Sequence, residues 1–177
     1  MLKFIGDLRS LLLALWLGAA CFFSFAIAPS AFGVLPSRDL AGSVVSRTLL
    51  IVNLSGIVIG AFLLLTSFLP NRNAKPFAVW IERLLLAILT IAGIVGQFVI
   101  GLWMSQIRTS VGKAIEELAE DDPLRLQFNQ LHEYSVYVLV GGMIAAALCY
   151  FLLAYRSRNT ENKEIKTTNK DLPDFKF

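Results

Sequence analysis

Five polar or ionisable residues at the margins of apolar sequence offer this chain its clearest chemistry. His132 is the only histidine, and an imidazole titrates near neutral pH and binds metals. Arg108 and Glu133 border two apolar stretches and are expected to form an ion pair, while Ser135 lies one helical turn after His132. Asn53 lies inside another apolar stretch. We predict that these five residues form one polar site at the outer mouth of a helical bundle.

The favoured role of His132 is a hydrogen-bonded buttress to Ser135, Asn53 or a backbone carbonyl, with proton transfer or ligand contact as the alternative. Haem held by two histidines is impossible within one chain. Cys21 and Cys149 have no charged neighbours in the sequence, which predicts packing roles. Motifs of nucleotide-binding loops, zinc proteases and nucleophile elbows do not occur. We therefore predict no catalytic residue, metal ligand or cofactor, and we favour a protein that is not an enzyme. The alternative is haem or a metal ion at the outer site.

Gln97 is a second polar feature, near the middle of the third apolar stretch. A polar side chain at mid-membrane usually faces protein or a cavity. A single interhelical hydrogen bond accounts for it, and a role in transport or catalysis is the alternative.

The distribution of charge reveals the helices that must position these residues. The chain has 177 residues, of which 56% are hydrophobic and 16% charged, whereas soluble domains average about 25% charged. A transmembrane helix needs about 20 apolar residues. Four stretches without Asp, Glu, Lys or Arg meet this length: Ser10–Ser37, Thr48–Asn71, Leu84–Ile107 and Tyr134–Tyr155. They exclude a soluble globular enzyme, a disordered chain and a disulfide scaffold.

The predicted fold is an all-α integral membrane protein, a four-transmembrane-helix bundle, because backbone polar groups in lipid must be satisfied within helices. The four-helix domain occupies residues 1–156. A basic cytoplasmic tail at 157–177 lacks apolar periodicity and is expected to be disordered. The expected spans are about 9–29, 48–69, 77–105 and 133–155.

A helical hairpin outside the membrane, at residues 108–133, is predicted between spans three and four. Apolar residues recur at helical spacing through 108–119, and Asp122-Pro123 is typical of a helix start. Two upright arms would turn at residues 120–122. The alternative bends residues 108–119 along the membrane interface, with Gly112 as the hinge.

Lysine and arginine counts predict the orientation. Eleven of the sixteen Lys and Arg fall in the N-terminus, the loop before span three and the tail, so both termini are expected in the cytoplasm of an inner- or plasma-membrane protein. Ala26-Ile27-Ala28 resembles a signal-peptide cleavage site, but the first apolar stretch is longer than a signal peptide requires, which favours a retained span.

Small residues predict where helices approach closely. Gly56 and Gly60 lie on one face of span two, with Asn53 a turn earlier. The pair serves a contact inside the bundle or, alternatively, a homo-oligomer. Between spans one and two, two prolines and a glycine prevent a regular helix throughout, and Ser37 or Asp39 is expected to cap the next helix.

Two sets of residues resemble a known family of membrane proteins. The first is Phe22-Phe23, Ala28-Pro29-x-x-Phe32-x-x-Leu35-Pro36 and Ala41-Gly42, and the second is Ile107-Arg108 and Phe128-Asn129-x-Leu131-His132-x-x-Ser135. Together they resemble the transmembrane protein 205-like family, known as domain of unknown function 4149, over residues 8–155. Val138 and Leu139 stand where that family often has an Asn. The resemblance implies a small multi-pass membrane protein and supplies no established reaction.

The sequence leaves three functions open. The first is a non-catalytic scaffold or partner-binding membrane subunit, with the lipid bilayer around it and an unidentified protein partner. The second is a haem-, metal- or quinone-binding protein with a site at the outer end of the bundle, and the third is a small-solute transporter. Nucleic-acid binding is not expected, because the net charge of +3 is explained by topology.

Overall fold

The computed structural model describes residues 2–68 and 76–170, and every regular element in these ranges is a helix. Four of its helical rods are long and apolar enough to cross a membrane: Gly6–Val34, Arg38–Thr66, Pro76–Val111 and Pro123–Asn159. Each predicted span lies within one of these rods, except for residues 67–69 of the second span. Residues 67 and 68 follow the last helical residue, and residue 69 lies outside the described ranges.

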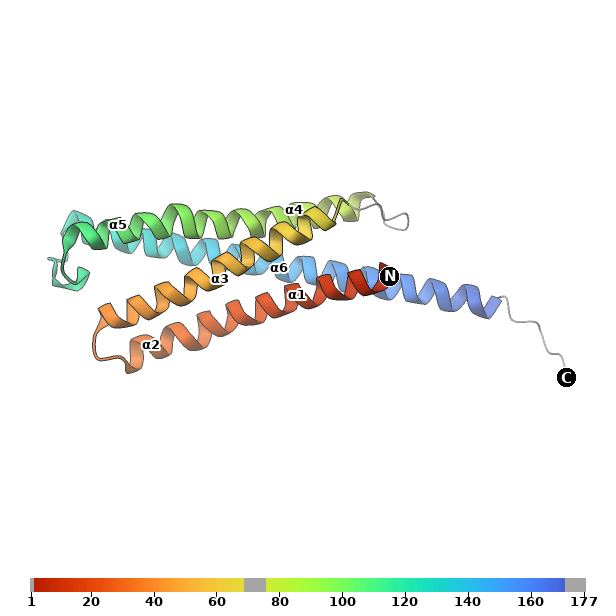
Figure 1. Cartoon of the computed structure of the whole chain (residues 1–177), viewed down its shortest axis with the longest axis horizontal. Coiled ribbons are helices and arrows are strands. Elements are labelled where there is room, and N and C mark those ends of the chain that lie inside the picture. The colour runs from red at the N-terminus through yellow and green to blue at the C-terminus, as the bar shows by residue number, and fades with distance from the viewer. Residues whose placement is uncertain (1, 69–75, 171–177) are drawn as a thin grey trace.

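The elements follow one another as α1 (Leu2–Phe22), the π-helix η1 (Phe23–Ile27), α2 (Ala28–Val34), α3 (Arg38–Thr66), α4 (Pro76–Ile94), the π-helix η2 (Val95–Gly101), α5 (Leu102–Val111), the 3₁₀ turn η3 (Ile115–Glu117) and α6 (Pro123–Lys170). The start of α1 and the far end of α6 lie at the same end of the molecule, here called the terminus end (Figure 1). The opposite end, which carries the segment 112–122, is called the loop end.

The four rods form a ring in which α4 packs against α3 and α6, and α1 packs against the same two helices. Toward the loop end, α2 and the start of α3 diverge from α5 and the start of α6 (Figure 1). The buried apolar residues accordingly form two clusters. The larger includes Leu13, Trp16, Leu63 and Leu86, and a smaller one joins Ile100, Ile107, Ile115 and Leu131 at the loop end.

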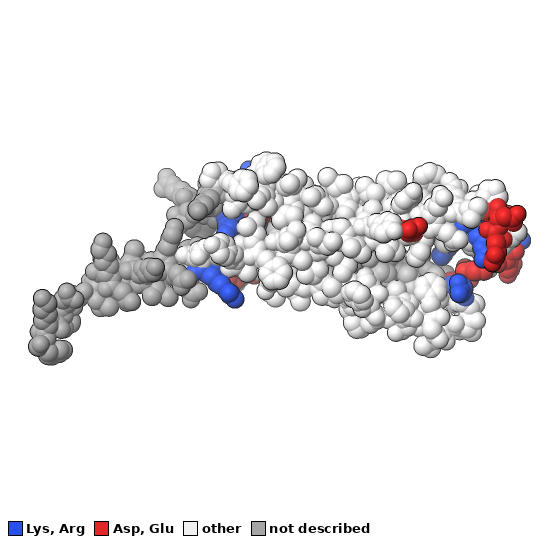
Figure 2. Space-filling model, turned by 180° about the vertical axis from the view of Figure 1, so that it is seen from behind, with Lys and Arg blue, Asp and Glu red and all other residues white. Residues whose placement is uncertain are grey.

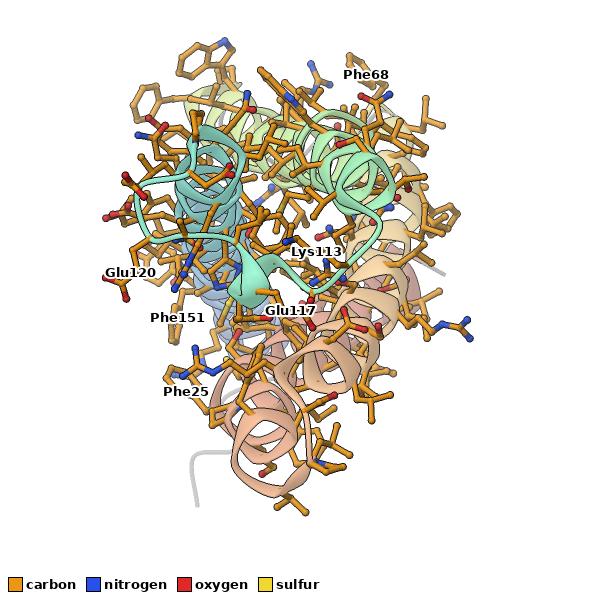
Figure 3. All side chains as sticks on the ribbon, turned by 90° about the vertical axis from the view of Figure 1, so that its left-hand side faces the viewer. Phe25, Phe68, Lys113, Glu117, Glu120 and Phe151 are labelled. Atoms are coloured by element: carbon orange, nitrogen blue, oxygen red, sulfur yellow. The ribbon has the colours of Figure 1, made fainter. Side chains whose placement is uncertain are left out.

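Charge is confined to the two ends of the visible surface, apart from an isolated acidic patch nearer the loop end (Figure 2). Acidic side chains gather at the loop end, and a broad uncharged band lies between the ends (Figure 2). Seen from the loop end, Phe25, Phe68 and Phe151 lie on the periphery (Figure 3), and they are 79%, 62% and 67% exposed. Large apolar side chains on the outer surface are what a lipid environment requires.

Local sequence explains how the rods start. The Ser37 side chain accepts a hydrogen bond from the backbone N–H of Leu40 at 3.2 Å, which confirms its predicted capping of α3. Asp122 Oδ1 accepts from Leu124 N at 2.8 Å, and Pro123 is the first residue of α6, as predicted. Pro29 does not break the first rod; it lies in the first turn of α2, directly after the π-helical segment η1.

The predicted helical hairpin at 108–133 is wrong, because residues 112–122 are not an α-helix and leave no first arm. Helix α5 ends at Val111 because Gly112 adopts a left-handed backbone with φ of 64°, which terminates a helix. Residues 113–122 form a loop with the single turn η3, so an interfacial helix over 108–119 is equally wrong. Ile115 belongs to the same buried cluster as Ile107 although it is reached through a loop. The apolar spacing from Ile107 to Ile115 therefore reflects shared burial and not a continuous helix.

The segment after Gly112 crosses the loop end. Lys113 and Glu117 lie on it between α5 and α6, and Glu120 points away from the helices (Figure 3). At the other end, residues 157–170 continue α6 where the sequence predicts a disordered tail. An established helix adds each further residue without a new nucleation cost. Residues 171–177 of that tail lie outside the described residues.

Candidate functional site

A buried carboxylate joins three helices near the terminus end. Glu82 on α4 is 1% exposed. Its Oε1 accepts a hydrogen bond from Arg9 Nη2 of α1 at 2.5 Å, and its Oε2 accepts from Arg156 Nη1 of α6. These three residues are called the Glu82 cluster. Because the side chains of Arg9 and Arg156 are only 13% and 22% exposed, the pairs are shielded from water and screened less than surface ion pairs.

Two arginines also satisfy the carboxyl end of α3. Arg9 Nη2 donates to the carbonyl of Leu63 at 3.0 Å, so this side chain links α1, α3 and α4. Arg83 Nη2 donates to the carbonyl of Ser67 at 3.0 Å, and its guanidinium lies 4.1 Å from the centre of the Phe68 ring. The carboxyl end of a helix carries a partial negative charge, which attracts cations. These contacts fasten all four rods together at the terminus end.

Sequence reasoning missed the Glu82 cluster. The available signal was that Glu82 is the only acidic residue between Asp39 and Glu116. It lies inside the predicted third span, where an acid calls for an internal partner. Arg9 and Arg156 stand at the matching ends of spans one and four, but nothing in the sequence shows that their side chains turn inward.

Trp16 and two glycines make close packing contacts in the interior between the rods. Trp16 is 5% exposed, and its Nε1–H donates to the carbonyl of Val52 at 3.0 Å. A Cβ on Gly56 would lie 2.8 Å from Trp16 Nε1, and a Cβ on Gly60 would lie 2.5 Å from Thr90 Oγ1. Both glycines are therefore used for close contacts within the chain.

Asn53 belongs to this interior and not to the loop end. It is 6% exposed, and its amide packs against Gly96, where a Cβ would lie 3.3 Å from Asn53 Nδ2. The Asn53 backbone carbonyl packs equally closely against Gly93. Asn53 lies two turns deeper along α3 than Ser46, which is about 10 Å at the rise of a helix.

Arg108 connects the two diverging halves of the loop end. Its Nη1 donates to Ser46 Oγ of α3 at 3.4 Å, and its guanidinium lies 5.2 Å from the centre of the Phe128 ring of α6. Gly42 permits this approach, because a Cβ there would lie 2.6 Å from Arg108 Nη2. Arg108 thus holds α3, α5 and α6 together.

The remaining predicted site residues lie on α6 and make contacts within that helix. Ser135 Oγ donates to the backbone carbonyl of His132 at 2.7 Å, and Glu133 Oε1 accepts from Tyr137 OH at 2.8 Å. The predicted ion pair between Arg108 and Glu133 is therefore not formed. His132 itself is exposed.

The five predicted residues consequently do not form one pocket. His132 is exposed, Ser135 and Glu133 form hydrogen bonds along α6, and Asn53 is enclosed by glycines of α4 and η2. The interaction that reaches across helices at the loop end comes from Arg108, and its partners are Ser46 and Phe128. Neither partner was predicted.

Gln97 and the two cysteines complete the predicted residues. Gln97 is half-buried within η2, and a Cβ on Gly101 would lie 3.7 Å from its Nε2. Cys149 is fully buried among the apolar residues of the larger cluster, Cys21 is half-buried, and both are free thiols. Within residues 2–68 and 76–170, no group of three His, Cys, Asp or Glu side chains is placed to hold a metal ion.

One comparison with known proteins gives a match. The family described as a domain of unknown function (DUF4149) matches residues 11–113, which span the first three rods, including Trp16, Glu82 and Arg108. No curated protein and no solved structure matches the chain.

Proposed function

Because the chain belongs to the family described as a domain of unknown function (DUF4149), whose name assigns no activity, we propose its function from the contacts of its own residues. The protein is a non-catalytic membrane subunit that serves as a scaffold or binds a protein partner. The observation that carries this proposal is the Glu82 cluster, in which the buried charges link α1, α4 and α6 to one another. Arg108 also links α3, α5 and α6, through a hydrogen bond to Ser46 and a cation–π contact with Phe128.

The proposal includes a place and an orientation. The rods form a four-helix bundle in an inner or plasma membrane, with the terminus end in the cytoplasm and the acidic loop end outside. The excess of Lys and Arg at the terminus end supports this sidedness. We also propose that residues 8–155 as a whole belong to the transmembrane protein 205-like family. The motif at residues 128–135 supports this proposal.

Sidedness is tested by labelling single cysteines in a variant with Cys21→Ala and Cys149→Ala. A membrane-impermeant maleimide is expected to label Glu120→Cys in intact cells, because residue 120 is exposed at the loop end. Ser157→Cys, exposed at the terminus end, serves as the matched control and is expected to react only after permeabilisation. The reverse pattern would contradict the proposed orientation.

The absence of a prosthetic group is tested on protein purified in mild detergent. Absorption spectra with and without dithionite are expected to show no Soret band, and metal analysis is expected to give no stoichiometric metal. His132→Ala is expected to leave both results and the stability unchanged within about 0.5 kcal/mol, as for surface positions. A chromophore or metal that disappears in His132→Ala would replace this proposal with a haem-, metal- or quinone-binding function.

A small-solute transporter is the second candidate, because Gln97 lies in the π-helical segment Val95–Gly101. Short π-helical segments inside α-helices occur frequently at functional sites. If transport is the function, proteoliposomes should accumulate a labelled solute and Gln97→Leu should abolish the flux. Under the favoured proposal, both proteins give the flux of protein-free vesicles.

A further inference from the structure

A shallow apolar groove of about 300 Å³ runs along the outer surface between the third and fourth rods. It lies at the middle of both rods, well away from the charged ends. Its lining residues come from α4, η2 and α6 and carry no charge: Ile88, Ile91, Ala92, Val95, Val138 and Gly141. None of the residues of the Glu82 cluster lines this groove, and neither do Arg108, Ser46 and Phe128.

Gly141 gives the groove an open floor. It is exposed, and a Cβ built on it would meet nothing within 4 Å. By contrast, Gly56, Gly60 and Gly93 are occupied by close contacts within the chain. Helices in membranes associate through packing, and small residues such as Gly141 and Ala92 let a neighbouring backbone approach.

An acidic residue lies on the same ridge of α6. Glu133, Tyr137 and Gly141 follow one another at intervals of four residues, which places them in one row along the helix. Glu133 is exposed, and Tyr137, which donates to it, is 62% exposed. Among the residues that the structure describes, Glu133 forms no ion pair. The ridge therefore presents a negative charge to whatever fills the groove below it.

We propose that this groove binds a transmembrane helix of another protein that carries a Lys or Arg level with Glu133. The inference rests on the proposed partner-binding function and specifies the partner's chemistry. An apolar stretch would pack over Gly141 and Ala92, and the cation would pair with the Glu133 carboxylate. A second copy related by a twofold axis through this ridge would bring two Glu133 side chains together, and like charges at an interface are unfavourable.

The test uses the full chain in vesicles of neutral lipid with a labelled, tryptophan-flanked leucine–alanine peptide that spans the bilayer. One peptide carries a single Arg near one end, and its matched control carries Gln at that position. Energy transfer from labelled protein is expected to show about tenfold tighter binding of the Arg peptide. Glu133→Gln is expected to remove this preference, and Gly141→Leu to weaken binding of both peptides. Gly18→Leu, an exposed glycine on α1 with equally open space, is expected to leave binding unchanged.

Three results would overturn the inference: equal binding of the two peptides, binding that Gly141→Leu does not weaken, or energy transfer between copies of the chain that Gly141→Leu abolishes. The last result assigns the groove to a second copy. Because Glu133 is exposed, Glu133→Gln is expected to fold. Its effect on the Arg peptide therefore decides the test even if Gly141→Leu fails to fold. If the two peptides bind equally and the purified protein shows no Soret band, only this inference is overturned. If the protein holds a chromophore or a metal, the proposed function itself is overturned.

Discussion

Glu82→Gln is expected to lower the free energy of unfolding by about 3 kcal/mol. Removing one partner of a buried ion pair costs about 3–5 kcal/mol, because an uncompensated charge remains. Here two arginines lose their common carboxylate, and the lower figure applies because the Arg9 and Arg156 side chains retain 13% and 22% exposure. Reversible unfolding in mixed micelles, followed by circular dichroism, measures the difference.

The matched control for this prediction is Glu117→Gln. Glu117 is an exposed acid on the loop after Gly112, and its neutralisation is expected to change stability by less than about 0.5 kcal/mol. Arg156→Gln leaves the pair between Arg9 and Glu82 in place and is expected to cost less than Glu82→Gln. Equal stabilities for Glu82→Gln and Glu117→Gln would show that the cluster does not hold the helices.

Trp16→Ala is expected to cost about 3 kcal/mol or more. Truncation of a buried tryptophan leaves a cavity that neighbouring side chains fill only in part. Trp16 packs against Gly56, and its ring also lies near Gly142 of α6. The loss therefore loosens contacts of α1 with both α3 and α6, and the same micelle unfolding measurement reports it.

Trp16→Phe keeps part of the aromatic packing but removes the donor to the Val52 carbonyl. The expected loss is at least about 1 kcal/mol but smaller than that of Trp16→Ala, because a hydrogen bond and only part of the ring volume are removed. Leu15→Ala, a 60% exposed position on the same helix, provides the control for truncation on the lipid-facing side. A Trp16→Ala variant as stable as Leu15→Ala would contradict the central place of this side chain.

Much of the fold could be predicted because its signals are local. Length and lack of charge specify the four apolar rods, and Ser37 and Asp122-Pro123 specify where two of them start. The predicted hairpin was wrong because a single residue, Gly112, ends the helix that was expected to form its first arm. Gly112 is compatible with a helix by spacing, but its left-handed backbone ends α5, and Ile115 returns to the core through a loop.

The candidate site was less predictable because it depends on side chains that meet across helices. Sequence spacing placed Arg108, Glu133 and Asn53 near one boundary, yet Arg108 turns to Ser46, Glu133 to Tyr137, and Asn53 inward. Glu82, Arg9 and Arg156 come from three rods, and only their packing reveals that they meet. Rotations of helices about their own axes, which decide such meetings, are not encoded in the apolar pattern of a single span.

The claim that Glu82, Arg9 and Arg156 compensate one another's burial between the helices has one direct test. The triple variant Arg9→Met, Glu82→Met and Arg156→Met replaces the whole cluster with apolar side chains of similar length. Because such replacements are often neutral or stabilising, its free energy of unfolding is expected to lie within about 1 kcal/mol of the parent protein, well above that of Glu82→Gln. A triple variant less stable than Glu82→Gln would contradict this account.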